Sequence, residues 1–420
     1  MRTHLIATLF LLAGMAHTSI AADSRKVIET YANIAEATYA DSLATAKILQ
    51  SKVQDLVAKP SSETLVAARH AWIAARVPYQ QSEVFRFGNK IVDDWEGKVN
   101  AWPLDEGLID YVQGDYGTES DENQHYAANV IAKKSLKIGG RTVDVSKITK
   151  KLLEKTLHEA DGIEANVATG YHAIEFLLWG QDLNGTRPGA GNRPASDYDT
   201  NECTGGNCDR RIAYLKAVTD LLVDDLTWMT AQWRVDGKAR RSLMDQSATQ
   251  ALTAIFTGMG SLSYGELAGE RMKLGLLLHD PEEEHDCFSD NTHASHFNDV
   301  LGISNVYLGS YKRIDGSIIA GPSVSDLVLA KSADADKRMR AALDASIAKF
   351  AEIVARAKGG EAYDQMIAQG NTAGNALVEA AIAALLAQTK EIERAIGALD
   401  LKPVAFESSD SLSKPAAVKQ

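Results

Sequence analysis

The strongest constraint on the fold is an apolar stripe that recurs every three or four residues along residues 26–57. Its members are Ile28, Ala32, Ala35, Tyr39, Leu43, Ala46, Leu49, Val53 and Leu56. This spacing places the side chains on one face of an α-helix, whereas a strand would require strict alternation. Similar patterns predict helices over residues 151–160, 164–179, 210–233, 242–256, 262–278, 334–357 and 372–399. Another is expected from the Ser61/Ser62 cap toward Phe87, with a kink at Pro78.

The predicted fold class is all-α. Strand-like alternation is confined to residues 135–145, which we expect to form a hairpin on a loop. A segment rich in Gly, Asn and Pro, residues 181–207, separates an N-terminal helical bundle (23–190) from a C-terminal one (205–402), and residues 403–420 are expected to be a flexible tail. The phrases FLLWGQDLNG (176–185) and VYLGSYKRIDG (306–316) are similar, which suggests a duplication.

The first 22 residues have the pattern of a signal peptide. Arg2 precedes an apolar run, LIATLFLLAGM, and small residues at positions 19–22 suit cleavage after Ala21 or Ala22. The run is too short to span a bilayer, and no later segment reaches about 18 apolar residues, so no transmembrane segment is predicted. We expect an exported protein, located in a bacterial periplasm or associated with the outer membrane.

Cysteine usage agrees with export. Cys203 and Cys208 bracket a short polar loop, CTGGNC, and predict a local disulfide in an oxidising compartment. A zinc knuckle would need two further Cys or His residues, and none lies within thirty residues on either side. Cys287 is left over, as a free thiol or as part of a site. The net charge of −12, from 44 Lys+Arg and 56 Asp+Glu, argues against nucleic-acid binding.

The most informative stretch is GYHAIEFLLWG, residues 170–180. His172 and Glu175 are three residues apart and share one face of the predicted helix. The positions around them are apolar, so both side chains are expected to be buried, where they must be paired or bound. A carboxylate and an imidazole at this spacing form half of a metal site. A hydrogen-bonded pair within the core is the alternative.

Two other places supply candidate oxygen ligands. The apolar face of the 61–87 helix continues into Glu83 and Arg86, which suggests a polar pocket, although the two could form a surface ion pair. The turn that contains Asp105 and Glu106 precedes an apolar stretch, and Asp105 could simply cap a helix. Together with His172 and Glu175 they would suffice for one divalent or ferric ion.

A third cluster is the loop from residue 279 to residue 293. Four of the eight histidines that follow the predicted leader fall within residues 279–296. Glu282 to Glu284 are most simply explained as a solvated acidic loop, whereas His285, Asp286 and Asp290 are the better functional candidates. The sequence contains no HExxH, phosphate loop, nucleophile elbow or dinucleotide fingerprint.

At the level of whole phrases, the chain resembles the imelysin-like family, also called insulin-cleaving metalloproteases. GYHAIEFLLWG matches its GxHxxE motif, and AARVPYQQSEVFRFGN, WPLDEGLIDYV and EEEHDCFSDNTHASHFNDVLGISNVYLGSY are similar to members called iron-regulated proteins. The resemblance implies two helical bundles related by duplication, with a site in the cleft between them. It also implies His172 and Glu175 as the leading pair, accompanied by Glu83, Arg86 and the Asp105–Glu106 turn.

Two functions follow as expectations. The first is a periplasmic metal-binding protein for iron acquisition, which binds iron or zinc and hands it to an uptake system. Its predicted ligands are His172, Glu175, Glu83 and Glu106, and its cleft residues are Arg86, Asp105, His285, Asp286 and Asp290. The second is a zinc-dependent metallopeptidase, in which Glu175 or Glu106 acts as the base on a peptide. A scaffold that binds a peptide or partner without metal is a third possibility.

Overall fold

The computed structural model describes residues 4–118 and 120–418, with side chains from residue 24 onward. The predicted signal peptide, residues 1–22, therefore lies outside the residues whose side chains are described. The all-α class is confirmed, because within the described ranges the only sheets are two short antiparallel hairpins. They pair β1 (Ser135–Ile138) with β2 (Arg141–Asp144), as predicted for residues 135–145, and β3 (Ser310–Lys312) with β4 (Ile318–Ala320).

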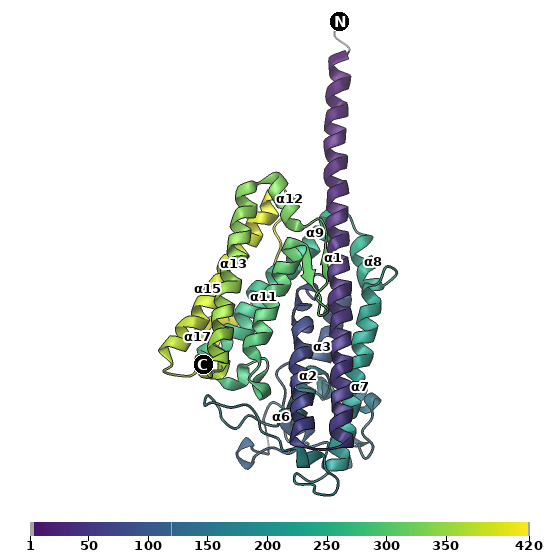
Figure 1. Cartoon of the computed structure of the whole chain (residues 1–420), viewed down its shortest axis with the longest axis vertical. Coiled ribbons are helices and arrows are strands. Elements are labelled where there is room, and N and C mark those ends of the chain that lie inside the picture. Colours follow the sequence, from purple (N-terminus) through teal and green to yellow (C-terminus); the bar gives the residue numbers. More distant parts are fainter. Residues whose placement is uncertain (1–3, 119, 419–420) are drawn as a thin grey trace.

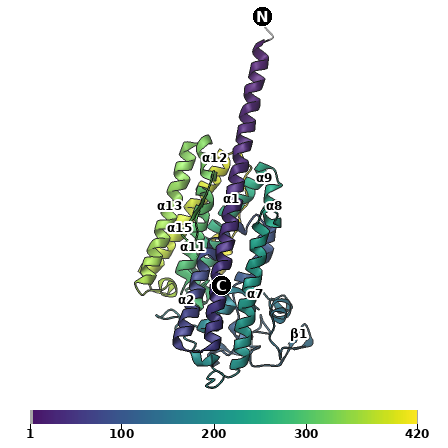
Figure 2. The ribbon, with the colours of Figure 1, turned by 45° about the vertical axis from the view of Figure 1, so that its right-hand side comes forward.

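The long helices form two neighbouring groups (Figures 1 and 2). In the first group α1 (His4–Ala58) packs against α2 (Ser62–Gln80) and α7 (Cys208–Trp233), with α3 (Lys90–Asn100) and α6 (Gly170–Trp179) beside them. In the second, α13 (Ala333–Lys358) packs against α15 (Thr372–Ala398) and α11 (Thr292–Leu308). Because α11 also contacts α2, one continuous apolar core runs through both groups.

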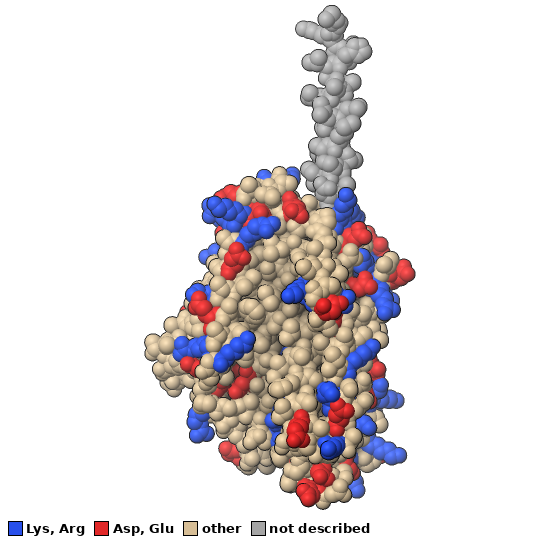
Figure 3. Space-filling view, viewed as in Figure 1, with Lys and Arg blue, Asp and Glu red and all other residues tan. Residues whose placement is uncertain are grey.

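The remaining helices are shorter and fill the ends and joints of the two groups. They are α4 (Glu106–Ile109), α5 (Lys150–Leu152), α8 (Lys238–Met244), α9 (Ala248–Ser261), α10 (Leu274–Leu278), α12 (Val324–Lys331), α14 (Tyr363–Ile367), α16 (Asp410–Ser413) and α17 (Pro415–Val418). No helix among the described residues is both long and apolar enough to cross a membrane. On the face shown in Figure 3, acidic and basic side chains are interspersed around a broad uncharged area.

Local sequence explains where the helices differ from expectation. The predicted helix over 242–256 is two helices, because Ser247 begins a new one with a capping box in which its hydroxyl accepts from the Gln250 N–H. The predicted helix over 164–179 begins only at Gly170, whose φ of +81° is not helical. The helix that begins at Ser62 ends at Gln80 and is followed by the 3-10 turn η1 (Glu83–Phe85) rather than continuing to Phe87.

One long segment, η6 (Leu262–Lys273), is a π-helix. Its hydrogen bonds join residues five apart, so side chains at that spacing meet on one face. Arg271 Nε accordingly donates to Glu266 Oε1 at 2.9 Å. Short π-helical turns are frequently found at functional sites, and η6 forms one wall of the cavity described below.

The C-terminal segment and α7 both pack against helices that precede them in the chain. Residues 403–418, expected to be a flexible tail, pack against η6 and its approach: the Glu407 N–H donates to Ser261 Oγ at 3.0 Å, and Ser411 Oγ donates to the Gly269 carbonyl at 2.9 Å. Small residues allow this, because a Cβ at Gly265 would overlap the Glu407 backbone. Although α7 belongs to the predicted C-terminal bundle, it packs against α1. The division into 23–190 and 205–402 and the duplication stay predictions.

Candidate metal centre

The GxHxxE helix owes its position to Gly170. A Cβ at this residue would overlap the backbone of Val99, so only glycine lets the start of α6 approach the end of α3 this closely. The Trp72 Nε1–H donates to the Tyr171 carbonyl at 2.9 Å and fixes the same turn against α2. This packing buries His172 beside Trp102, with the ring centroids 5.0 Å apart.

His172 and Glu175 are hydrogen-bonded to each other, which is the arrangement that the sequence left open as the alternative to half of a metal site. His172 Nδ1 lies 3.0 Å from Glu175 Oε2, and both side chains are completely buried. The other carboxylate oxygen, Oε1, accepts from the main-chain N–H of Ser289 at 3.0 Å and from its hydroxyl at 2.7 Å. His172 Nε2, in contrast, is buried and has no hydrogen-bond partner.

The electrostatic surroundings keep His172 neutral. Burial, reinforced by the Arg76 guanidinium, holds the pKa of His172 well below its usual value. Burial and the nearby Asp286 carboxylate raise the pKa of Glu175, while Ser289 opposes that shift. When Glu175 is ionised, it accepts a hydrogen bond from the Nδ1–H of His172, and this tautomer leaves a free lone pair on Nε2. In metal sites, the ring nitrogen of a histidine that does not bind the metal usually donates a hydrogen bond, often to a carboxylate, which fixes the orientation of the ring.

His285 and Asp286 complete the group. They lie in the connection between the 3-10 turns η7 (Pro281–Glu283) and η8 (Cys287–Ser289). One ligand atom from each of His172, His285 and Asp286 lies within 4.8 Å of the other two, and all three side chains are buried. Two ligands of one ion at about 2.1 Å are at most about 4.2 Å apart when they lie on opposite sides of it, and about 3.4 Å apart at tetrahedral angles. Atoms separated by 4.8 Å would therefore have to approach one another by roughly 0.6–1.4 Å to share one ion.

Arg76 and Asn100 support this group from behind. Arg76 Nη2 donates to Asp286 Oδ1 at 2.8 Å, and its Nη1 donates to Asn100 Oδ1 at 2.6 Å. Asn100 Nδ2 in turn donates to His285 Nε2 at 3.2 Å, which assigns that nitrogen as an acceptor. Arg76 holds the pKa of the buried Asp286 below its usual value, so the carboxylate stays charged. An ion bound at His285 Nε2 would replace the Asn100 hydrogen bond.

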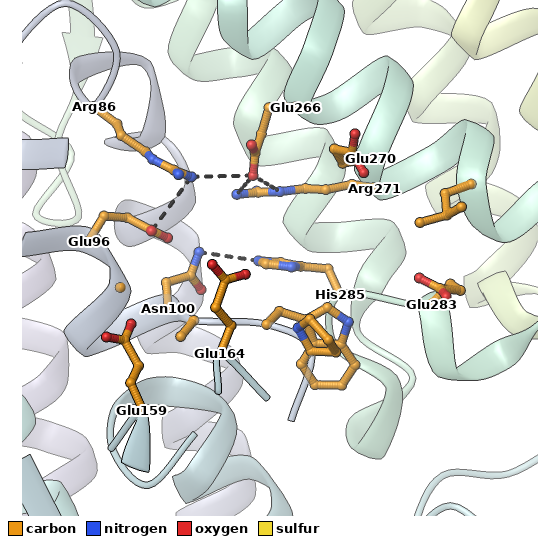
Figure 4. A pocket seen from close by; sticks show the side chains of 15 residues that line it. Arg86, Glu96, Asn100, Glu159, Glu164, Glu266, Glu270, Arg271, Glu283 and His285 are labelled. Atoms are coloured by element: carbon orange, nitrogen blue, oxygen red, sulfur yellow. Dashed lines mark hydrogen bonds and ion pairs between the residues drawn. The ribbon is translucent and has the colours of Figure 1, made fainter. Parts of the chain in front are cut away.

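A cavity of about 470 Å³ leads to the group, and His285 is the one member of the three that lines it. Figure 4 shows His285 and Asn100 facing Glu266 and Arg271 of η6. Arg86 pairs with Glu96 at 3.5 Å and with Glu266 at 3.4 Å. Four further acids on the wall have no ion-pair partner among the described residues: Glu159, Glu164, Glu270 and Glu283. The entrance is therefore acidic.

The other predicted site residues lie elsewhere. Glu83, predicted as a ligand, is paired with Arg271 Nη2 at 2.6 Å. Glu106 is buried, which raises its pKa to about 7, and it is not part of the three-residue group. Asp105 accepts from the Asn123 amide, and Asp290 lies near Asp364. The structure thus brings His172 and Glu175 together with His285 and Asp286, and leaves Glu83 and Glu106 outside.

Three residues that form hydrogen bonds in the site, Arg76, Asn100 and Ser289, are not among the predicted site residues. Arg76 follows Trp72 by four residues on the apolar face of α2, so a lone charge in that stripe was a usable signal. Asn100 and Ser289 carry no comparable signal, because amides and hydroxyls are common at helix ends and in loops. The Cys203–Cys208 disulfide is confirmed, and Cys287 is a buried free thiol.

The fold and the site together define an all-helical protein with a buried imidazole and carboxylate group behind an acidic cavity. The imelysin family model matches residues 35–392, and the chain belongs to that family. Iron-regulated protein A of Synechococcus elongatus is 30% identical over 101 residues, which are 24% of this chain and 28% of that protein. The chain thus matches little more than a quarter of this relative's length.

A solved structure supports the fold over almost the whole chain. A chain of Parabacteroides distasonis, named as an iron-regulated protein A precursor, superimposes with a TM-score of 0.66. The match covers 90% of this chain and 95% of that one, at 19% identity.

Proposed function

We propose that this protein binds a single metal ion, iron in preference to zinc, through His172, His285 and Asp286. The observation that carries the proposal is the buried Nε2 of His172, which has no hydrogen-bond partner while Nδ1 is held by Glu175. Leaving a buried polar atom unpaired costs about 1–3 kcal/mol, so such atoms call for an explanation. A metal ion would use that lone pair.

The donor set suits iron as cargo. Two imidazoles and one carboxylate with open positions are the set found around non-haem ferrous iron, although zinc also accepts such ligands. The names of the two similar proteins point in the same direction, because both refer to iron regulation. With the predicted signal peptide, these features support an exported protein of a bacterial periplasm or outer membrane that passes iron to an uptake system.

The arrangement favours binding over peptide hydrolysis. A metallopeptidase needs a carboxylate that is free to take a proton from metal-bound water. Both oxygens of Glu175 are already engaged, one by His172 and one by Ser289. The acidic cavity would attract cations, whereas a peptide would have to fit among four carboxylates that lack partners.

The test is metal uptake by protein stripped with chelator and then exposed to ferrous iron under anaerobic conditions, or to zinc. We expect one equivalent of iron in the wild type and in His70→Ala, a control that removes an exposed histidine of α2. His172→Ala and His285→Ala should each lose uptake. Metal content is measured by plasma mass spectrometry, and circular dichroism checks that each variant is folded.

Folded His172→Ala protein that still took up one equivalent would refute the assignment. Stoichiometric zinc with no iron would refute the iron preference. Cleavage of a denatured protein substrate by zinc-loaded wild type, lost in Glu175→Gln, would favour the metallopeptidase.

A further inference from the structure

A second cavity, of about 410 Å³, lies at the C-terminal end of α6. Its walls come from three parts of the chain: from within residues 179–184, from within residues 190–194, and from Tyr111 and Gln113. Among the described residues, none lines both this cavity and the acidic one. The volume is in the range of about 300–1,000 Å³ that is usual for small-molecule sites, so the chemistry of the lining indicates what the cavity would hold.

The lining of this cavity is polar but carries no net charge. Four side-chain amides contribute to it: Gln113, Gln181, Asn184 and Asn192. In the described part of the chain, no acid lines the cavity, and Arg193 is the one basic residue that does. The Arg193 guanidinium is compensated, because Nη1 lies 2.7 Å from Asp110 and 2.9 Å from Asp197. Arg211, which also pairs with Asp110, completes a cluster of two arginines and two aspartates. The cavity therefore favours neither an anion nor a cation.

One hydrogen-bond donor of a residue that lines this cavity lacks an acceptor. Arg193 Nε is buried without a hydrogen-bond partner, in a side chain that is 1% exposed. Gly180, which also lines the cavity, leaves space beside it, because a Cβ at Gly180 would lie 3.7 Å from Nε. The φ of Gly180 is +73°, a conformation that other residues rarely adopt, so this space stays open. Buried donors are normally satisfied, so this N–H calls for an acceptor oxygen from a bound molecule.

Apolar surface borders the same cavity. Tyr111 is 36% exposed and Leu183 is 53% exposed, and both line it. The Tyr111 ring is fixed in place, because its hydroxyl donates to Asp197 Oδ2 at 2.6 Å and the Arg193 guanidinium lies 4.9 Å from its centroid. A side chain that is already ordered loses little conformational freedom when a ligand packs against it. The cavity therefore suits a molecule that has apolar faces and uncharged polar groups.

We propose that this cavity binds a short neutral saccharide. The C–H faces of a sugar ring are apolar and would pack against Tyr111 and Leu183. Its hydroxyl groups both donate and accept hydrogen bonds, as do the side-chain amides of the wall, and a sugar oxygen would accept from Arg193 Nε. A peptide fits less well, because peptides bind mostly along strand edges or in apolar grooves, and the residues of this cavity belong to no strand.

The test is isothermal titration of the full chain with two uncharged trisaccharides, maltotriose and triacetylchitotriose, supported by saturation-transfer NMR. We expect one equivalent of at least one of them to bind the wild type. Gln113→Ala and Asn192→Ala remove exposed amides that form no side-chain hydrogen bond within the described residues, so both variants should fold. Each should weaken binding about 2–10-fold, the effect of losing one hydrogen bond. Gln54→Ala, which removes an exposed amide of α1, is the matched control and should bind like wild type.

The outcomes separate this site from the metal centre. A wild type that binds neither trisaccharide, or a Gln113→Ala/Asn192→Ala double variant that binds like wild type, would overturn the proposal. Binding of trialanine in place of both trisaccharides would make the cavity a peptide site and would also overturn it. His172→Ala should bind the saccharide like wild type whether or not it binds iron, and a folded His172→Ala protein without saccharide binding would refute a separate site.

Discussion

Two buried polar clusters in this protein both contain arginine–aspartate ion pairs but differ in the kind of atom that they leave unpaired. In the first, Arg193 contacts Asp110 at 2.7 Å and Asp197 at 2.9 Å, while Arg211 contacts Asp110 at 2.6 Å. In the second, Arg76 neutralises Asp286, but His172 keeps an unpartnered nitrogen. Burial of charge is common to both clusters, so it does not by itself mark a functional site. The arginine cluster also has a buried atom without a partner, Arg193 Nε, but an arginine N–H cannot bind a metal ion. The His172 cluster differs because its unpartnered atom, Nε2 of an imidazole, can offer a lone pair to a metal ion.

The largest effect that this comparison predicts is on stability. Arg211→Met removes one of the two arginines that pair with Asp110 and leaves only Arg193. It also removes donors to the main-chain carbonyls of the disulfide loop. We expect the free energy of unfolding to fall by about 3–5 kcal/mol, the usual result of breaking a buried ion pair. Urea unfolding measures it. Arg338→Met removes an exposed pair with Asp334 and should leave the urea midpoint nearly unchanged, because water screens such a pair. Equal effects of the two variants would contradict the comparison.

Glu106 provides a third case for this comparison, because its carboxyl group is buried but belongs to neither cluster. Burial raises its pKa from 4.5 to about 7. The unfolded chain releases this proton near pH 4.5 but the folded chain only near pH 7, so the carboxyl destabilises the fold increasingly across that window. Glu106→Gln should therefore gain about 3 kcal/mol relative to wild type between pH 4.5 and pH 8. Urea unfolding at both pH values tests this, and a difference independent of pH would count against it.

The smallest effect concerns the residue that orients His172. Glu175→Gln keeps a group that can bond to Nδ1 but removes the charge, and we expect iron affinity to fall about 10–100-fold. Competition with a coloured chelator measures it, with Glu352→Gln on the exposed face of α13 as the control. Unchanged affinity together with a large loss of stability would make the His172–Glu175 pair structural, like the arginine cluster.

Sequence patterns predict the helical class and the buried His172–Glu175 pair because periodicity and local spacing determine both. They do not predict which residue pairs with Glu83, because its partner Arg271 is 188 residues away in the sequence and comes close to Glu83 only through tertiary packing. His285 and Asp286 stand out as a dense cluster of titratable residues, but their approach to His172 depends on how α6 meets the η7–η8 connection. The sequence motif includes Gly170, but the motif alone does not predict that Gly170 packs against the backbone of Val99.

The π-helix η6 makes the cavity sensitive to the number of residues in the chain. Glu266 and Arg271 meet because they are five residues apart in a helix of that type. If one residue between them were deleted, for example Ala268, and the segment kept its π winding, everything that follows would turn by one residue's rotation, which is about 100° in an α-helix. Arg271 would then point away from Glu83, and the cavity would lose its principal counter-charge. We therefore expect homologues to tolerate substitutions in this segment far more readily than changes of length.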